Sequence, residues 1–192
     1  MKGLEKLTSI RLAEVLSQKN VVPTDAITDA LYTQDHFGEP FVEVLVSMGH
    51  ITEWDLARVV VDHFQLPFIT ASNCDISGEV LERLPQDALF ENLLVPLDTF
   101  GDGMTVAMPI LTPFEVIDGL QRTHDCDLFP YVGLISENKR VLQEMFKGYV
   151  DWQKRRDEQL EQRRQTKPKK SSKDWMNIFD TGDEAVRNQL DR

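Results

Sequence analysis

Residues 11–34 read RLAEVLSQKNVVPTDAITDALYTQ and residues 40–63 read PFVEVLVSMGHITEWDLARVVVDH, and the two stretches repeat one pattern. A shift of 29 positions superimposes their apolar residues in the pairs Leu12/Phe41, Val15/Val44, Leu16/Leu45, Val22/Ile51, Ile27/Leu56 and Leu31/Val60. The i, i+3, i+4 spacing predicts two helices in each copy. Asn20 and Gly49 share one place in the turn, and both residue types accept the left-handed backbone that ends helices. The sequence therefore predicts a helix–turn–helix unit used twice, forming a helical bundle over residues 1–66.

The pattern changes after the second repeat, where a Leu-Pro pair ends the helix. Residues 93–100 and 104–108 alternate as strands do and are joined by a Gly-Asp-Gly loop, so they predict a β-hairpin. Pro96 lies inside the first of these strands, which indicates an edge position or a bulge. We expect residues 67–150 to form a small α+β subdomain, a sheet covered by helices.

Two helix starts are indicated by local capping signals. Thr112-Pro113-Phe114-Glu115 places a threonine at the N-cap, a proline at the first helical position and a glutamate where it completes a capping box. Apolar residues over 128–134 fit a further strand, and Ser136 is expected to cap a helix that carries its apolar stripe as far as residue 149.

The C-terminal part of the sequence is polar and charged. Residues 151–166 keep helix-forming residues but hold Leu160 as their one apolar side chain after Trp152, so we expect a solvated helical extension. Pairs such as Asp151 and Arg155 at i, i+4 would each contribute about 0.2–0.5 kcal/mol to that helix. Residues 167–192 read as a basic linker and a flexible tail.

The tail nevertheless contains a short apolar motif. Trp175, Ile178 and Phe179 are spaced as one face of a short helix, which would order only against another surface. We interpret the motif as a docking segment for the groove of a protein partner, with packing on the chain's own body as the alternative.

Composition excludes several classes of protein. The chain has 192 residues, 41% hydrophobic and 28% charged, which is ordinary for a water-soluble protein. No apolar run approaches the roughly 20 residues that span a bilayer, and the N-terminus lacks the features of a secretory signal. Cys74 and Cys126 are too few for a disulfide framework and too far apart for a CxxC site. The four histidines have no metal-ligand spacing. We expect a cytoplasmic protein without a metal site or cofactor.

Charge is distributed unevenly along the chain. The net charge is −11, made up of −5 over residues 1–66, −8 over 67–150 and +2 over 151–192. Residues 154–173 carry a local +6, which permits nucleic-acid binding through this basic arm, although no aromatic residues are interleaved with the charges. No paired carboxylates accompany a nucleophile in a recognisable arrangement, so the sequence predicts a protein that is not an enzyme.

The doubled motif, the Leu66-Pro67-Phe68-Ile69 that follows it and the α+β pattern beyond resemble the N-terminal domain of type II secretion and type IV pilus assembly ATPases. This module, called the GspE N-terminal or MshEN domain, has repeats of the form R-L-G-x-x-L-x-x-x-G-x-I-T-x-x-x-L-x-x-x-L-x-x-Q. The resemblance covers about residues 7–150. It implies a binding role, because some members bind the dinucleotide cyclic di-GMP with the paired repeats and others dock on a cytoplasmic partner of the secretion machine. The motor's G-x-x-x-x-G-K-[ST] loop is absent here, so we expect a relative without the ATPase motor.

Carried over position by position, the resemblance implies nucleotide-binding roles for Arg11, Leu12, Leu16, Gln34, Leu45 and Gly49. The arginine and the backbone near glycine would meet guanine and phosphate, and the apolar positions would pack on the bases. The second copy departs from this pattern, with Pro40 for arginine, Val42 for glycine and His63 for glutamine. Ala13 replaces a glycine in the first copy. A Cβ at a glycine position obstructs close approach of a ligand, and Pro40 removes a cation that would pair with phosphate.

These observations together predict an α+β protein with an N-terminal bundle of two helix–turn–helix repeats, a small α+β domain with a β-hairpin, a helical extension and a flexible tail. The function they favour is that of a non-catalytic adaptor or regulator that binds protein partners of a secretion, pilus or signalling machine. A cyclic di-GMP sensor, or a sensor of a related nucleotide, is the alternative. Nucleic-acid binding through the basic arm is a third, less favoured hypothesis.

Overall fold

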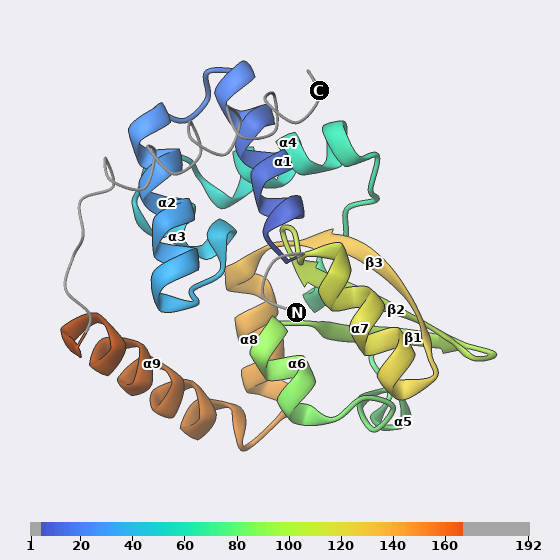
Figure 1. Ribbon diagram of the computed structural model, residues 1–192. Helices are drawn as coiled ribbons and strands as arrows, with labels where there is room; N and C mark the ends of the chain where they lie inside the picture. The colour runs from blue at the N-terminus through green and yellow to red at the C-terminus, as the bar shows by residue number, and fades with distance from the viewer. Residues whose placement is uncertain (1–4, 167–192) are drawn as a thin grey trace, which may run out of the picture.

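The structure is a computed structural model of the chain, and it describes residues 5–166 (Figure 1). Its first four helices form the two predicted repeats, with turns at the predicted places. Asn20 has φ of 52° and Gly49 has φ of 75°, so each turn uses the left-handed backbone that the sequence indicated. The helices are α1 (Glu5–Gln18), α2 (Thr24–Phe37), α3 (Phe41–Ser47) and α4 (Glu53–Phe64).

A three-stranded sheet follows in the order β1-β2-β3. The predicted hairpin is confirmed, because β1 (Val95–Phe100) pairs antiparallel with β2 (Gly103–Pro109). Strand β1 lies at an edge of the sheet and its register shifts between Pro96 and Asp98, so both of the alternatives expected for this proline are found. Strand β3 (Asp127–Gly133) pairs parallel with β2, and helix α7 (Phe114–His124) makes the crossover between them. Figure 1 shows the hairpin projecting from the body, with α7 lying across the sheet.

Further helices complete the described part of the chain, and one of them differs from the expectation. The helix expected from Ser136 to residue 149 is interrupted, because Phe146 adopts an extended backbone with φ of −122° and ψ of 110°. Two helices result, with different directions in Figure 1. The elements are the 3-10 turn η1 (Ala71–Asn73), α5 (Gly78–Leu81), α6 (Gln86–Asn92), α8 (Ile135–Met145) and α9 (Tyr149–Thr166).

The start of α7 is capped by a different residue from the one predicted. Helix α7 begins at Phe114, and the buried hydroxyl of Thr112 has no hydrogen-bond partner among the described residues. Thr8 of α1 caps the helix instead: its Oγ1 accepts from the N–H of Phe114 at 3.3 Å and donates to the Glu115 carboxylate at 3.1 Å. The capping chemistry is therefore the expected kind, but the threonine comes from the first repeat.

Helix α8 is capped in a similar way from another element. The helix begins at Ile135 and has no side-chain cap of its own. The prediction that Ser136 is its N-cap is therefore wrong. The Glu53 carboxylate of α4 accepts from the N–H of Ser136 at 3.1 Å and from its hydroxyl at 2.9 Å. Both caps link the repeats to the α+β region.

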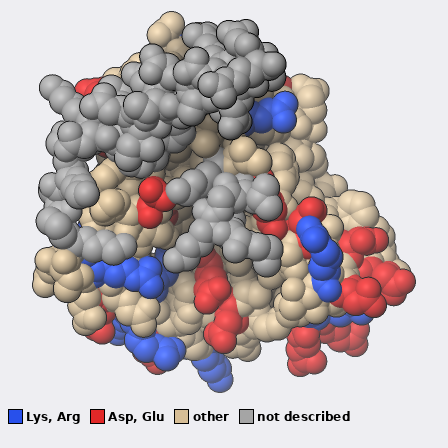
Figure 2. All heavy atoms as spheres, in the orientation of Figure 1, with Lys and Arg blue, Asp and Glu red and all other residues tan. Residues whose placement is uncertain are grey.

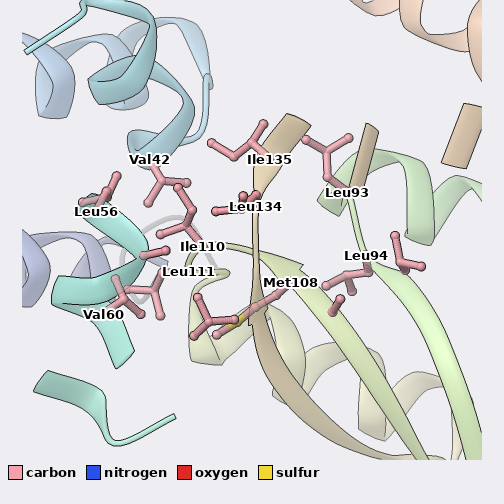
Figure 3. Packing of buried hydrophobic residues seen from close by; sticks show 14 of the residues in the cluster. Val42, Leu56, Val60, Leu93, Leu94, Met108, Ile110, Leu111, Leu134 and Ile135 are labelled. Carbon is pink, nitrogen blue, oxygen red and sulfur yellow. The ribbon is translucent and has the colours of Figure 1, made fainter. Parts of the chain in front are cut away.

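The hydrophobic core continues from the repeats into the α+β region. Figure 3 shows Val42, Leu56 and Val60 of α3 and α4 facing Ile110 and Leu134, which border the sheet. All of these residues belong to one cluster of buried side chains. The α+β fold is as predicted. The division into units at residues 66 and 67 stays a prediction.

Candidate binding site on the paired repeats

Three of the six predicted nucleotide-binding residues are part of the core. Leu12, Leu16 and Leu45 are each 0% exposed and belong to the same buried cluster. In this conformation they hold the helices of the two repeats together and are closed off from solvent. The role that the family resemblance implies for them stays a prediction.

The other three lie nearer the surface, in separate surroundings. The Arg11 guanidinium carbon lies 5.7 Å from the centre of the Phe64 ring, a cation–π contact between α1 and α4. Gln34 donates from Nε2 to the hydroxyl of buried Ser9 at 3.0 Å, a bond between α2 and α1. Gly49 is exposed in the turn after α3. The structure does not gather these three residues around one point.

One cavity does bring two of the predicted residues together. It has a volume of about 240 Å³ and lies between α1, the end of α2, the start of α3 and the loop before α7. Its lining includes Leu12 and Gln34 together with Thr8, Ser9 and Pro40. The lining mixes hydroxyl, amide and carboxylate groups with apolar side chains, which suits a small ligand with both polar and apolar surface.

The second repeat carries a buried carboxylate between two cations. Glu43 of α3 accepts from the Lys139 Nζ of α8 at 2.8 Å and from the Arg156 guanidinium of α9 at 3.0 Å. Burial acts to raise the pKa of Glu43, but the charges of Arg156 and Lys139 and their hydrogen bonds outweigh it and hold the pKa below its ordinary value. The carboxylate is therefore ionised at neutral pH and fixed between three elements.

The far end of α9 makes a second set of contacts with the same repeat. Arg164 forms a bidentate pair with Glu39, with distances of 2.9 Å and 2.7 Å. Arg163 donates to the main-chain carbonyl of Phe37 at 3.3 Å. Bidentate arginine–carboxylate pairs fix orientation as well as contributing energy. These bonds tie the last turns of α9 to the segment that joins the two repeats.

The start of α9 is held by aromatic contacts. The Phe90 ring of α6 lies 5.1 Å from the Tyr149 ring and 5.6 Å from the Trp152 ring, centre to centre. Burial is the main reason that the pKa of Tyr149 rises to about 12. The expected helical extension is present and most of its residues are exposed, but contacts that the sequence did not predict also dock it on the body. The expected Asp151–Arg155 pair is replaced by a bond from Arg155 Nε to the main-chain carbonyl of Asp151 at 3.2 Å.

A groove of about 410 Å³ remains between α9 and the body. One wall is α9, and the other is formed by α3 and the start of α8. The Glu43–Arg156 and Glu39–Arg164 pairs cross from wall to wall. The groove is lined by Glu39, Pro40, Glu43, Val46, Ser47, Glu53, Ile135, Lys139, Arg156, Asp157, Leu160, Glu161 and Arg164. The face of the second repeat is therefore already occupied by a helix of the same chain.

Sequence reasoning missed this contact because its partners are more than a hundred residues apart. Arg156 and Glu43 are separated by 113 positions, and Arg164 and Glu39 by 125. A usable signal was present: both basic positions fall on a helix without an apolar face, and both acidic positions flank the proline that replaces the family's arginine. Helices without an apolar face need charged partners to dock.

The remaining expectations concern the docking motif of the tail, metal binding and membrane-spanning helices. The docking residues Trp175, Ile178 and Phe179 lie outside the described residues. Within residues 5–166, no group of three or more histidine, cysteine, aspartate or glutamate side chains is placed to hold a metal ion. Among the helices in that range, none combines the length and the apolar character that crossing a bilayer would need.

Comparison with known proteins shows a family similarity over part of the chain. Residues 64–149 match the family model of the MshEN domain. This part of the chain is similar to the MshEN domain. The match begins at the end of α4, so it covers the α+β region, and the two repeats precede it.

The curated proteins to which the chain is similar include two pilus assembly ATPases. The Type IV pilus assembly ATPase PilB of Myxococcus xanthus is 26% identical over 111 residues, which are 58% of this chain and 20% of that protein. PilB of Thermus thermophilus is 24% identical over 107 residues, which are 56% of this chain and 12% of that protein. The chain thus matches a fifth or less of the length of these relatives.

Solved structures show the same fold. A structure of MshE with cdg has a TM-score of 0.54 at 18% identity, and the match covers 70% of this chain and 98% of that one. The N-terminal domain of XpsE has a TM-score of 0.57 at 20% identity, with 71% and 94% covered. The chain therefore shares its fold with the MshE structure and with the N-terminal domain of XpsE.

Proposed function

We propose that the chain is a non-catalytic, cytoplasmic adaptor or regulatory module of a type II secretion or type IV pilus assembly machine, and that it acts by binding protein partners. The observation that carries the proposal is the docking of α9 on the second repeat through Glu43 and Glu39. A surface that holds a helix by charge pairs and a shallow groove has the properties of a polypeptide-binding surface.

The charges of the second repeat support a protein ligand over a phosphate-bearing one. Pro40 stands where the family has arginine, and the carboxylates of Glu39 and Glu43 lie on either side of it in the sequence. Both carboxylates line the groove beside α3. The groove is lined by five carboxylates and three cations, and this excess of negative charge is unfavourable for a phosphodiester.

The proposal is tested with the full chain and the assembly ATPase of the same cell. Co-sedimentation of the two proteins and a change in the rate of ATP hydrolysis on adding the chain are the expected results. Exchange of Glu39 for lysine should weaken the complex, because it reverses the charge of the repeat face. An ATPase that neither co-sediments nor changes its rate, with its cytoplasmic partner proteins present, contradicts the proposal.

A cyclic di-GMP sensor is the second candidate. Two observations favour it: the MshE structure that shares this fold was determined with cdg, and Leu12 and Gln34 of the first repeat line one cavity. On this hypothesis the dinucleotide raises the melting temperature of the chain, since a ligand that binds the native state stabilises it. Replacement of Arg11 by alanine would then remove the shift, whereas replacement of Arg58, exposed on α4, would leave it unchanged.

A further inference from the structure

The sheet has one face that is covered at one end and open at the other. In the strand register Asp98 pairs with Thr105, Phe100 with Gly103, and Thr105 with Phe129, so these residues share a face. Toward the body this face is closed by α8, whose buried Asn138 donates to the carbonyl of Ala107 at 2.9 Å. Toward the hairpin loop it is open: Phe100 is 52% exposed and Phe129 is 45% exposed.

The two exposed rings are held in place by the strand beneath them. Their centres are 5.1 Å apart. A Cβ added at Gly103 would come within 2.9 Å of the Phe129 ring and 3.0 Å of the Phe100 ring, so glycine lets both rings lie against the sheet. A rigid pair of exposed aromatic rings loses little conformational entropy when a partner packs on it. We call Asp98, Phe100, Asp127 and Phe129 the hairpin face.

Carboxylates surround these rings without a compensating cation. Asp98 and Asp127 share the face, and Asp102 and Asp125 lie at the two adjoining turns. None of these four forms an ion pair with another residue of the described range. Figure 2 shows acidic side chains gathered, with basic side chains beside them, at the end of the molecule where the hairpin projects. Such a surface attracts a cationic segment, and its aromatic rings accept both cations and apolar anchors.

The chain contains one segment with the matching chemistry. Residues 167–179 read KPKKSSKDWMNIF, four lysines and one aspartate followed by Trp175, Ile178 and Phe179. This segment lies outside the described residues. It follows directly on α9, and Figure 1 shows α9 on the opposite side of the molecule from the hairpin. A hairpin face within its reach therefore belongs to a neighbouring copy of the chain.

We propose that residues 167–179 of one copy bind the hairpin face of another, with lysines paired to Asp98 and Asp127 and with Trp175 packed on the Phe100–Phe129 pair. The contact is heterologous, so the chain self-associates as concentration rises. It is also electrostatic in part, and it weakens as salt is added. The inference does not depend on the proposed adaptor role.

Sedimentation velocity of the full chain over a wide concentration range tests this contact. The expected result is a weight-average mass that rises with concentration at low salt and falls back at high salt. Phe129→Ala should weaken association about tenfold, as loss of a central aromatic anchor does. Phe114→Ala, which removes an exposed ring from α7, should leave the association unchanged. A chain that is monomeric at every concentration in low salt overturns the proposal, as does association that Phe129→Ala leaves intact.

A charge exchange separates direct contact from loss of folding. The first variant is Asp98→Lys/Asp127→Lys, and the second is Lys169→Glu/Lys170→Glu. Each alone is expected to stay monomeric, because face and segment then carry charges of the same sign. The mixture is expected to associate, because opposite signs are restored between the two variants. If the mixture of the two folded variants stays monomeric, the contact between copies is contradicted. A wild-type chain that stays monomeric because the segment binds its own body contradicts it as well.

Discussion

Thr8 shows how a single residue joins two parts of this chain. It lies in α1, yet its hydroxyl satisfies the first turn of α7, 106 positions further on. The local sequence Thr112-Pro113-Phe114-Glu115 contains all the signals of a capping box, but the structure leaves the Thr112 hydroxyl buried and without a described partner. A buried threonine from another helix can take this role because helix starts need only an acceptor at the right place.

The two threonines should therefore respond differently to the same substitution. Thr8→Val removes an acceptor for the N–H of Phe114 and is expected to destabilise the chain by about 1 kcal/mol. Thr112→Val removes a hydroxyl with no described partner and is expected to cost nothing or to stabilise. Urea denaturation followed by circular dichroism measures both. A larger loss of unfolding free energy for Thr112→Val than for Thr8→Val would indicate that Thr112 is the cap, as the local sequence predicts.

Glu43 gives stability a defined dependence on pH. Its pKa is lower in the folded chain than the reference value of 4.5, so its ionised form stabilises the fold above that value. As pH falls below 4.5 toward the lower folded pKa, the carboxylate becomes protonated and this contribution is lost. Glu43→Gln should cost about 1–3 kcal/mol at neutral pH, because two cations lose their partner.

The test for Glu43 compares two pH profiles of the free energy of unfolding. The wild-type chain and the Glu43→Gln variant should differ by a constant amount from neutral pH down to the reference value, and the difference should shrink below it. Glu144→Gln is a suitable control, because Glu144 is exposed and, in the described part of the chain, pairs with Arg140 of its own helix alone. If the difference in unfolding free energy between the wild-type chain and Glu43→Gln grows as pH falls, the lowered pKa of Glu43 is contradicted.

At the scale of elements, α9 combines an anchored start with a far end held by charge. Phe90, Tyr149 and Trp152 hold the first turns by aromatic packing, whereas Arg156, Arg163 and Arg164 hold the rest by polar contacts. Polar contacts of partly exposed side chains are weakened by salt, and apolar packing is not. The far end of α9 is therefore the part of this helix with the lowest expected local stability.

Hydrogen exchange tests that difference within one helix. Arg164→Ala should raise amide exchange severalfold in the last two turns of α9 and leave the turns around Trp152 unchanged. Arg155→Ala is the matched control, because it removes the same charge from the same helix, while the one hydrogen bond of Arg155 within residues 5–166 is to the main chain of Asp151. Equal effects of the two substitutions would show that charge, and not the contact with Glu39, sets the stability of this end.

At the scale of the whole molecule, the core crosses the boundary that the sequence suggested. Leu56 of α4 and Ile110 at the end of β2 belong to one buried cluster, and Figure 3 shows the two sides facing each other. The caps from Thr8 and Glu53 add polar links across the same boundary. Repeats and α+β region should then unfold together as one cooperative unit.

Differential scanning calorimetry measures that cooperativity. A single transition whose calorimetric and van't Hoff enthalpies agree is the expected result. Leu56→Ala should lower the transition temperature of the whole chain while keeping one transition, because the cavity it leaves costs about 2–5 kcal/mol. Two separate transitions, with only the first shifted by this substitution, would support two independent units at 1–66 and 67–150.

Much of the fold could be predicted because its signals are local. The turns at Asn20 and Gly49, the Thr52 cap whose hydroxyl accepts from the N–H of Asp55, and the hairpin all depend on residues close in sequence. The candidate site depends on pairs such as Glu43–Arg156, which no periodicity connects. The repeat pattern also cannot distinguish a buried leucine that packs the core from one that packs a ligand, so Leu12 and Leu45 looked equally suited to both roles.

The claim that the repeat face serves protein contacts is tested most directly by isothermal titration calorimetry. Cyclic di-GMP is titrated into the full chain, with guanosine monophosphate as the control ligand. The account predicts no saturable heat up to high micromolar dinucleotide, because Pro40 and two paired carboxylates occupy the place of a phosphate-binding cation. Saturable heat with cyclic di-GMP, lost in the Arg11→Ala variant, would contradict it and establish the first repeat as a working nucleotide site.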